Sequence, residues 1–253
     1  MYFYSWTHDI NNKNLLELKE SARRYNIKIN YLGINSFKSV DMKIKLLYDQ
    51  LCTLDDNKIV CAVDGFDVFI CAGADEIKQR FLSFNCDCVI SAERAYSHQY
   101  EKYKDFYDKI DCKSPYRYVN SGSIIGYVGA LKKIYAPTFA TILLPKIFSV
   151  IRKVKIKFNL NFIPGFYYFD QKRIGEYVAK NPENLKVRLD HDTKIFWCCA
   201  WEWEDIDNHF KVENAKIINS HTNNAPLIIH VPGWRKHRDV LTKLFKIQES
   251  LGK

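Results

Sequence analysis

The sequence predicts an α/β protein whose central sheet is mostly parallel and is flanked by helices. Strand-like and helix-like stretches alternate between residues 2 and 63 in the order strand, helix, strand, helix, strand. This order is typical of a parallel sheet with crossover helices on its faces. The third strand, 59–63, is apolar throughout, as expected for a strand that is buried on both faces.

The N-terminal half supplies most of the expected sheet. Apolar runs and helical spacing predict a strand over 2–6, a helix over 14–25, a strand over 27–32, a turn at 33–35, a helix over 42–54 and a strand over 59–63. In the first helix Leu15, Leu16, Leu18 and Ala22 follow helical spacing, with polar residues between them. In the second helix Ile44 and Leu47 belong to one apolar face. We therefore expect both helices to pack on the sheet.

The following segments are less regular. A helix over 74–84 should turn Ile77, Phe81 and Leu82 inward. The polar and aromatic segment 93–118 is a candidate lid that contains a short helix. The other expected elements are a strand over 88–92, a turn running into a strand over 118–126, a helix over 169–179, an extended segment over 187–189, strands over 194–199 and 227–231, and a helix over 238–251.

Residues 136–168 form the least regular segment. Prolines interrupt it, and basic and apolar residues take turns over 146–157. We interpret it as an insert or an acceptor-side flap; a surface-seeking amphipathic segment and a solvated face are the alternatives. The chain shows no internal repeat, low-complexity tract or linker, so we expect one domain over 1–253.

The composition is that of an ordinary soluble globular protein, with 47% hydrophobic and 26% charged residues. The net charge of +9 favours anionic partners such as phosphates or nucleic acid. The basic residues are scattered and no RNA- or DNA-binding signature is present, so a nucleic-acid-binding protein is only a remote alternative.

The cysteines and the apolar segments bear on the compartment. None of the eight cysteines forms a Cys-x-x-Cys pair, which argues against a zinc site or a disulfide scaffold. No signal peptide is visible at the start of the chain. The longest apolar stretch, 139–151, contains a proline and a lysine and is shorter than the roughly 20 residues that span a bilayer. We expect no transmembrane segment and a cytoplasmic or other reducing compartment.

The candidate chemistry begins directly after the buried strand 59–63. Asp64 and Asp67 lie where that strand ends, with Gly65 between them. In an open α/β sheet ligands bind at the carboxyl ends of the strands. Two carboxylates at this spacing have the oxygen ligands that a divalent cation needs. An Asp-Gly turn between two strands, without a metal, is the alternative.

A late stretch offers partners for the two aspartates. His230 ends a predicted strand and offers a third ligand, although a single late histidine is often structural. Gly233 lets the backbone approach a phosphate, and Lys236 supplies positive charge. The sequence has no Walker loop, no Gly-x-Gly-x-x-Gly and no Gly-x-Ser-x-Gly, which removes the main support for ATPases, dinucleotide-binding enzymes and serine hydrolases.

Five stretches in this order carry a resemblance to a known family. They are Val63-Asp64-Gly65-Phe66-Asp67-Val68, Ser91-Ala92-Glu93, Asn120-Ser121-Gly122 with Ile125-Gly126, Leu189-Asp190-His191 with Ile195-Phe196, and His230-x-x-Gly233-x-x-Lys236. The chain resembles, over nearly its whole length, the glycosyltransferase domain of the multifunctional procollagen lysyl hydroxylases, which has a GT-A fold with a mixed, mostly parallel sheet. No hydroxylase portion follows, so the resemblance implies a stand-alone transferase.

The resemblance also implies roles for individual residues. Asp64, Asp67 and His230 would bind Mn²⁺ at the diphosphate of a UDP-sugar. The implied donor-binding residues are Phe66 against the uracil, Thr7 and Lys43 at the nucleotide, Gly233 and Lys236 at the diphosphate, and Asn120 and Gln171 beside the sugar. The implied catalytic candidates on the sugar and acceptor side are Asp170, Asp190 and Glu93.

The sequence departs from the family pattern where the sugar and the acceptor bind. The family has a run of aspartates ahead of its Asp-Gln pair, whereas here Asp170-Gln171 follows two tyrosines and a phenylalanine. The family tryptophan after Ser-Ala-Glu is also absent, and Arg94-Ala95-Tyr96-Ser97 stands there.

The resemblance implies a Mn²⁺-dependent hexosyltransferase that retains the anomeric configuration. UDP-glucose is the expected donor and galactosyl-hydroxylysine in a collagen-like chain is the expected acceptor. A UDP-sugar transferase that acts on another glycan or on a small molecule is the alternative.

Overall fold

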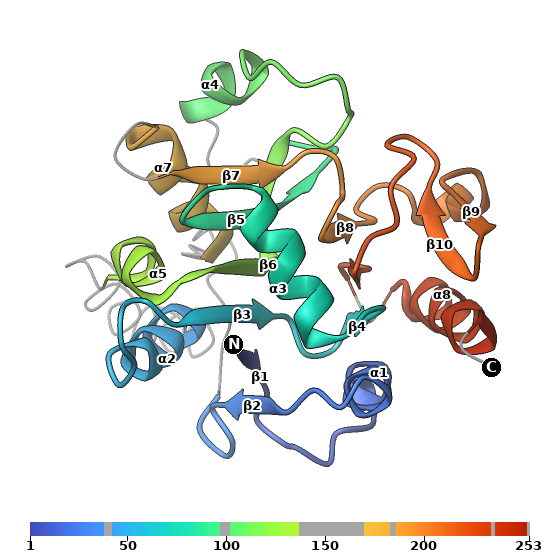
Figure 1. Cartoon of the computed structure of the whole chain (residues 1–253), viewed down its shortest axis with the longest axis horizontal. Helices are drawn as coiled ribbons and strands as arrows, with labels where there is room; N and C mark the ends of the chain where they lie inside the picture. Colours follow the sequence, from blue (N-terminus) through green and yellow to red (C-terminus); the bar gives the residue numbers. More distant parts are fainter. Residues whose placement is uncertain (38–41, 97–101, 137–169, 183–185, 234–235, 252–253) are drawn as a thin grey trace, which may run out of the picture.

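The computed structural model of the chain describes residues 1–37, 42–96, 102–136, 170–182, 186–233 and 236–251. A six-stranded sheet lies at its centre, in the order β2-β1-β3-β6-β5-β7 (Figure 1). These strands are β1 (Tyr2–Trp6), β2 (Ile29–Leu32), β3 (Ile59–Val63), β5 (Cys88–Glu93), β6 (Tyr118–Tyr127) and β7 (Val187–Asp190). Strand β1 is parallel to β2 and β3, and β5 is parallel to β7. Strand β6 is antiparallel to β3 and β5, so the sheet is mixed.

A second sheet brings distant segments together beside the central one. Its strands are β4 (Val68–Ile70), β11 (Ile228–His230) and β8 (Phe196–Cys198), in the order β4-β11-β8. Strand β11 is antiparallel to β4 and parallel to β8. This pairing places His230 directly opposite Val68 and Cys198. The second sheet therefore carries a histidine from near the end of the chain to the turn that follows β3.

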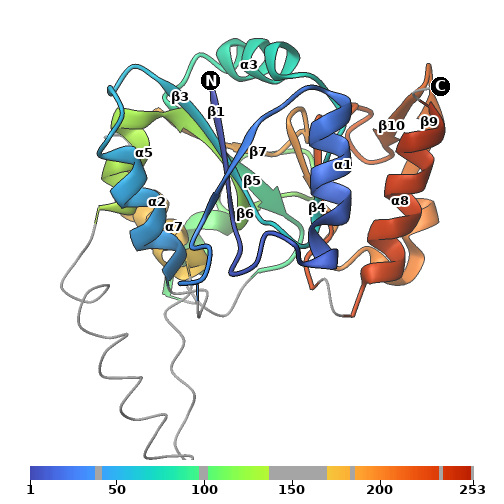
Figure 2. The same cartoon turned by 90° about the horizontal axis from the view of Figure 1, so that it is seen from below.

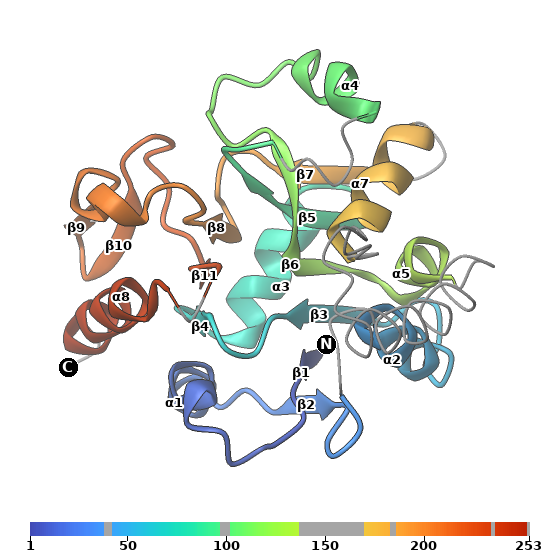
Figure 3. The same ribbon diagram turned by 180° about the vertical axis from the view of Figure 1, so that it is seen from behind.

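Helices cover the sheets. They are α1 (Leu16–Arg24), α2 (Met42–Leu51), α3 (Ala74–Ser83), α4 (Lys104–Asp108), α5 (Val128–Tyr135), α7 (Asp170–Lys180) and α8 (Arg238–Leu251). Helices α2, α5 and α7 gather on one side of the molecule, and α8 lies on the opposite side beside the hairpin β9 (Phe210–Glu213) and β10 (Lys216–Asn219) (Figures 2 and 3). Two short 3₁₀ helices, η1 (Lys13–Leu15) and η3 (Trp203–Asn208), complete the described elements.

Apolar side chains account for the position of the central strands. Every residue of β3 is buried, which agrees with its uninterrupted apolar sequence. Helix α2 buries Ile44 and Leu47, and α1 buries Leu18 and Ala22. The helical spacing of these residues thus predicts the faces that pack inward.

Several expectations were wrong in detail. Tyr118–Tyr127 is one continuous strand, because its residues pair with both neighbouring strands, and no turn precedes it. Leu82 is 39% exposed, since the buried stripe of α3 runs through Ile77 and Phe81 alone. Helix α5 and the hairpin β9–β10 were not predicted. Of the expected insert at 136–168, all but Ala136 lies outside the described residues, as does part of the candidate lid.

Two expectations about the chain as a whole can be compared with the structure. All eight cysteines are free thiols, in agreement with the predicted absence of disulfides. Within the part of the chain that the structure describes, none of the helices has both the length and the apolar character that crossing a bilayer requires.

Candidate active site

The carboxyl end of β3 and the end of β11 meet at a group of three potential metal ligands. Asp64, Asp67 and His230 each offer one ligand atom, and these atoms all lie within 4.8 Å of one another. Nε2 of His230 is 3.9 Å from Oδ2 of Asp64 and 3.5 Å from Oδ1 of Asp67. Backbone hydrogen bonds hold the arrangement, because the amide of Asp64 donates to Gly122 and the amide of Val231 donates to Asp67. The structure thus brings the predicted metal ligands together.

The orientation of His230 fits a metal ligand. Its Nδ1 lies 3.0 Å from Oδ1 of Asn120, an oxygen that also accepts from the amide of Gly122. Nδ1 is therefore the protonated nitrogen that donates, which leaves Nε2 to face the carboxylates. Nε2 is buried and has no hydrogen-bond partner among the residues that the structure describes. A lone pair that faces two carboxylates without a cation is unfavourable, so this donor set suits a divalent metal with nitrogen and oxygen ligands.

Burial and the neighbouring carboxylates act in opposite directions on the pKa of His230. Burial lowers the pKa of His230, but the carboxylate of Asp67, and then that of Asp64, outweighs burial and raises the pKa overall. Burial raises the pKa of Asp64, and Lys43 opposes that rise. The carboxylates beside His230 therefore favour a positive charge at this position.

Two glycines make room for the site. A Cβ atom at Gly122 would lie 2.2 Å from Cε1 of His230, so a larger residue there would displace the imidazole. A Cβ atom at Gly65 would lie 2.7 Å from the carbonyl oxygen of Trp6. Close approach of neighbouring atoms to the backbone therefore explains why both positions hold glycine. Neither glycine has a left-handed φ.

Lys43 connects the aspartates to α7. Its Nζ atom forms an ion pair with Asp64 and lies 3.3 Å from Oδ2 of Asp170, the first residue of α7. The ammonium group also lies 5.3 Å from the ring centroid of Trp6. Although burial lowers the pKa of Lys43, the carboxylates of Asp170 and Asp64 raise it overall. Lys43 is thus a buried, fixed positive charge at the predicted nucleotide site.

Glu93, Asn120 and Gln171 form a hydrogen-bonded group beside His230. Asn120 donates to Oε2 of Glu93 at 3.0 Å, and Gln171 donates to Oε1 at 2.6 Å. Burial raises the pKa of Glu93 to about 7, and the hydrogen bonds from Asn120 and Gln171 reduce that rise. Four residues predicted to face the sugar, Glu93, Asn120, Asp170 and Gln171, therefore lie in one network with the metal ligands.

Asp190 occupies a different environment. Its carboxylate is fully buried and accepts hydrogen bonds from the backbone amides of Lys194, Ile195 and Phe196. Burial raises its pKa to about 6, and these backbone bonds limit the rise. None of its described contacts reaches the metal ligands. Asp190 fixes the path of the chain between β7 and β8, and its catalytic role stays a prediction.

The residues predicted to hold the nucleotide surround the carboxyl ends of β1 and β3. Thr7 is buried, and its hydroxyl donates to the carbonyl of Asp9 at 2.8 Å. Phe66 is half-buried on the turn after β3, with the ring of His8 at its edge and 6.3 Å between centroids. Arg238 donates to the carbonyl of Phe66 at 3.0 Å and fixes this turn from α8.

The predicted diphosphate loop follows β11. Gly233 has a φ of +86°, a conformation that favours glycine, and its carbonyl accepts from the amides of Lys236 and His237 at 2.7 and 3.1 Å. Gly233 and Lys236 are both exposed. The turn thus exposes its backbone at Gly233 and a lysine shortly after His230, the predicted metal ligand.

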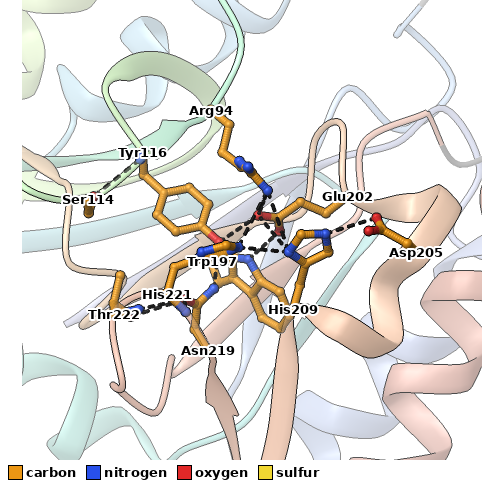
Figure 4. A network of polar contacts seen from close by, with 10 residues as sticks. All are labelled: Arg94, Ser114, Tyr116, Trp197, Glu202, Asp205, His209, Asn219, His221 and Thr222. Atoms are coloured by element: carbon orange, nitrogen blue, oxygen red, sulfur yellow. Dashed lines mark hydrogen bonds and ion pairs between the residues drawn. The ribbon is translucent and has the colours of Figure 1, made fainter.

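A second group of metal-type ligands lies farther along the chain, at Glu202, His209 and His221. Nη1 of Arg94 lies 3.2 Å from Oε1 of Glu202 and 3.5 Å from both Nδ1 of His209 and Nε2 of His221 (Figure 4). The guanidinium group already supplies the cation, and His209 and His221 contact each other at 2.8 Å. We therefore assign no metal to this group.

Sequence reasoning missed an aromatic cluster next to the site. Trp201, Trp203 and His237 lie close together, as described below. The signal was available, because two tryptophans flank a glutamate directly after the predicted strand 194–199. Their meeting with His237 depends on the second sheet, which the sequence did not predict.

Comparison with known proteins gives a family match and a fold match. The family model described as "PLOD GT domain" matches residues 9–139. Procollagen-lysine,2-oxoglutarate 5-dioxygenase 1 of Mus musculus is 24% identical over 234 residues, which cover 86% of this chain and 28% of that protein. The chain thus spans less than a third of the length of this relative.

One further sequence relative and one solved structure are also similar to this chain. Uncharacterized protein R699 of Acanthamoeba polyphaga mimivirus is 36% identical over 87 residues, covering 34% of this chain and 18% of that protein. The crystal structure of a glycosyltransferase involved in the glycosylation of the major capsid of PBCV-1 aligns with a TM-score of 0.51 and 15% identity, over 96% of this chain and 98% of that one. The expected GT-A architecture is confirmed at the level of the fold.

Proposed function

The chain belongs to the PLOD GT domain family, and from that premise we propose that it is a metal-dependent glycosyltransferase that transfers glucose from UDP-glucose to galactosyl-hydroxylysine in a collagen-like chain. Membership of a glycosyltransferase family and the fold establish the general class. The donor sugar, the metal and the acceptor are the proposal.

The observation that carries the proposal is the position of Nε2 of His230. This buried atom has no hydrogen-bond partner in the described part of the chain and faces Asp64 and Asp67. Mn²⁺ fits these nitrogen and oxygen ligands, and when bound it would supply charge that offsets the negative charge on the departing UDP.

The chain's own cations and backbone act on the same diphosphate. Lys236 and the backbone at Gly233, both exposed, would bind the phosphate oxygens. Lys43 is held by Asp64 and Asp170, so it adds fixed positive charge without a cost of ordering when substrate arrives. Phe66, which is half-buried, would contact the uracil.

The polar groups beside His230 are suited to the donor sugar. Glu93, Asn120 and Gln171 hold one another through hydrogen bonds, so their geometry is set before substrate binds. Glu93 and Asp170 are the catalytic candidates that lie in this network, and Asp190 positions the neighbouring loop. Retention at the anomeric carbon follows from the family resemblance.

Transfer assays test the donor and the acceptor. We expect glucose transfer from UDP-glucose to galactosyl-hydroxylysine peptides with Mn²⁺, and a loss of at least roughly a hundredfold in the Asp67→Asn variant. Asp75→Asn, which changes an aspartate on the first turn of α3, is the matched control and should transfer at the parent rate. Transfer from UDP-glucose that is equal in Asp67→Asn and the parent would overturn the metal assignment.

A transferase for another glycan or for a small molecule is the second candidate. The observation that favours it is Arg94, which lies in the part of the sequence where the family tryptophan is missing and forms an ion pair with Glu202. A panel of glycan acceptors with each UDP-hexose separates the two candidates. Absence of transfer to collagen peptides with every donor, together with transfer to another acceptor, would favour the second.

A further inference from the structure

Three aromatic side chains contact one another in a row outside the residues assigned above, and Trp201 at one end is the exposed member. The indole rings of Trp201 and Trp203 are 5.7 Å apart between centroids and tilted by 32°. Trp203 stacks on the imidazole of His237, with centroids 4.1 Å apart and planes at 16°. Trp201 is 67% exposed. We call Trp201, Trp203 and His237 the aromatic platform.

The platform is attached to the candidate active site from two sides. The amide of Cys199 donates to the carbonyl of the metal-ligand residue His230 at 2.8 Å, and Trp201 follows two residues later. His237 belongs to the diphosphate turn, because its amide donates to the carbonyl of Gly233. A Cβ atom at Gly233 would lie 3.1 Å from the His237 ring. The platform therefore adjoins the predicted diphosphate turn and is joined through the backbone to the strand that carries His230.

Glu202 lies between Trp201 and Trp203 in the sequence and anchors the loop that carries both tryptophans. Its side chain is fully buried and accepts from the hydroxyl of Tyr116 at 2.7 Å and from Nε1 of Trp197 at 2.8 Å (Figure 4). Arg94, the neighbour of Glu93, forms an ion pair with the same carboxylate at 3.2 Å. These charge-assisted contacts hold the loop in one conformation.

The conformation and the exposure of Trp201 are both energetically unfavourable. Trp201 has a φ of +68°, a left-handed conformation that is unfavourable for a bulky residue. The same residue leaves most of a large apolar ring in water. Backbone strain and apolar exposure at one residue, beside a buried anchor, indicate a surface that is kept ready for a ligand.

We propose that the aromatic platform binds the pyranose ring of the acceptor, a galactoside, by stacking on its apolar face. This inference rests on the proposed function, which requires an acceptor sugar beside the metal and the diphosphate. The axial hydroxyl of galactose leaves one ring face of C–H groups, and such a face stacks on exposed indole. In the proposed function Phe66 contacts the uracil of the donor. The aromatic platform is therefore available to the second substrate, the acceptor.

Nuclear magnetic resonance of the tryptophan indole N–H groups tests the proposal independently of transfer. The probe is methyl β-D-galactopyranoside, added to the full chain, with glycerol as a polyol control that has no ring face. Single replacements assign the five tryptophans. We expect the galactoside to shift the signals of Trp201 and Trp203 along a saturating curve and to leave Trp6 unchanged.

Variants complete the test. Trp201→Ala should weaken the saturating shift of Trp203 roughly tenfold, and Trp201→Phe, which keeps a ring, should restore most of it. A galactoside that leaves both signals unchanged, or a shift matched by glycerol or retained in Trp201→Ala, overturns the platform. Shifts of the same signals by UDP with Mn²⁺, without any by the galactoside, also overturn it and assign the surface to the donor.

Failure of the proposed function and failure of the aromatic platform give different results. Failure of that function shows as no transfer from any UDP-hexose, whereas failure of the platform shows as no galactoside shift. In an active protein at saturating UDP-glucose, Trp201→Ala should raise the KM for the galactoside acceptor roughly tenfold, and Trp201→Phe should keep it close to the parent value. An unchanged acceptor KM would contradict the platform.

Discussion

Lys43 and Asp170 form an ion pair, with 3.3 Å between Nζ and Oδ2, that joins the beginning of α2 to the beginning of α7. The same ammonium group pairs with Asp64, so one lysine serves two carboxylates from distant parts of the chain. Both aspartates and the lysine are largely buried, with side-chain exposures of 20%, 8% and 11% for Asp64, Asp170 and Lys43. The ion pairs of Lys43 therefore contribute both to the stability of the fold and to the charge of the predicted donor site.

Replacing Lys43 should therefore affect stability and metal response together. Lys43→Met leaves Asp64 and Asp170 without their buried cation, which costs about 3 kcal/mol of the free energy of unfolding. Mn²⁺ should recover more stability in this variant than in the parent. Thermal unfolding with chelator and with Mn²⁺ measures both effects. Lys45→Met is the control, because Lys45 is 74% exposed and pairs with Asp49 on its own helix.

The prediction for Lys43 fails if Lys43→Met and Lys45→Met unfold alike. It also fails if Mn²⁺ stabilises Lys43→Met no more than it stabilises the parent. Either result would mean that Lys43 does not compensate the charge of the aspartates.

The stability of the protein should depend on pH through Glu93. Burial raises its pKa to about 7 from the usual 4.5, so the folded state holds the proton more tightly than the unfolded state does. The resulting stabilisation is fully present below about pH 4.5 and is lost as the pH rises through about 7. Between about pH 5 and pH 8 the parent should lose about 3 kcal/mol relative to Glu93→Gln.

Chemical denaturation of both proteins across that pH range measures this difference. Glu204→Gln is the control, because Glu204 is exposed, and its unfolding should follow the parent at each pH. A parent curve parallel to that of Glu93→Gln would show that Glu93 titrates normally.

Gly122 should be indispensable to the orientation of His230. In Gly122→Ala the new methyl group would meet the imidazole at 2.2 Å from Cε1, and β6 is paired on both sides and cannot shift freely. We expect the free energy of unfolding to fall by about 1–3 kcal/mol. We also expect Mn²⁺ with UDP to stabilise the variant no longer. Gly73→Ala is the matched control, because a Cβ atom there meets nothing within 4 Å. Retention of the full metal response in Gly122→Ala would contradict the role given to His230.

Glu202 should be a structural anchor for the aromatic platform. Glu202→Ala removes a buried carboxylate and leaves Tyr116, Trp197 and Arg94 without their shared acceptor. We expect a loss of roughly 3 kcal/mol by chemical denaturation. Glu213→Ala, on an exposed position of β9, should cost less than about 0.5 kcal/mol. Equal costs for the two variants would remove Glu202 as an anchor.

The sequence was sufficient for strands β1 and β3 and for naming three candidate metal ligands that the fold brings together. The apolar run of β3 and the spacing of Leu18 and Ala22 are local signals that burial explains directly. Asp64, Asp67 and His230 were predicted together because the ordered motifs resemble a family, and the structure brings them within reach of one ion. Their binding of a metal remains a prediction, as does the single domain over 1–253.

What the sequence could not predict depends on contacts between distant segments. Strand β6 was expected to begin with a turn, because its serines and glycines are typical of turns, but pairing on both sides keeps it extended. Leu82 was expected inward, and tertiary packing decided otherwise. The stacking of Trp203 on His237 requires the second sheet, whose three short strands come from separate parts of the chain.

The central claim is that Asp64, Asp67 and His230 hold a divalent metal that binds UDP. Thermal unfolding of the parent and of Asp64→Ala, each with UDP in the presence and absence of Mn²⁺, tests it most directly. At a UDP concentration of about a hundred times its Kd, Mn²⁺ should raise the Tm of the parent on the order of 5 °C and leave Asp64→Ala nearly unchanged. Equal stabilisation of both proteins by UDP, with no contribution from Mn²⁺, would contradict the claim.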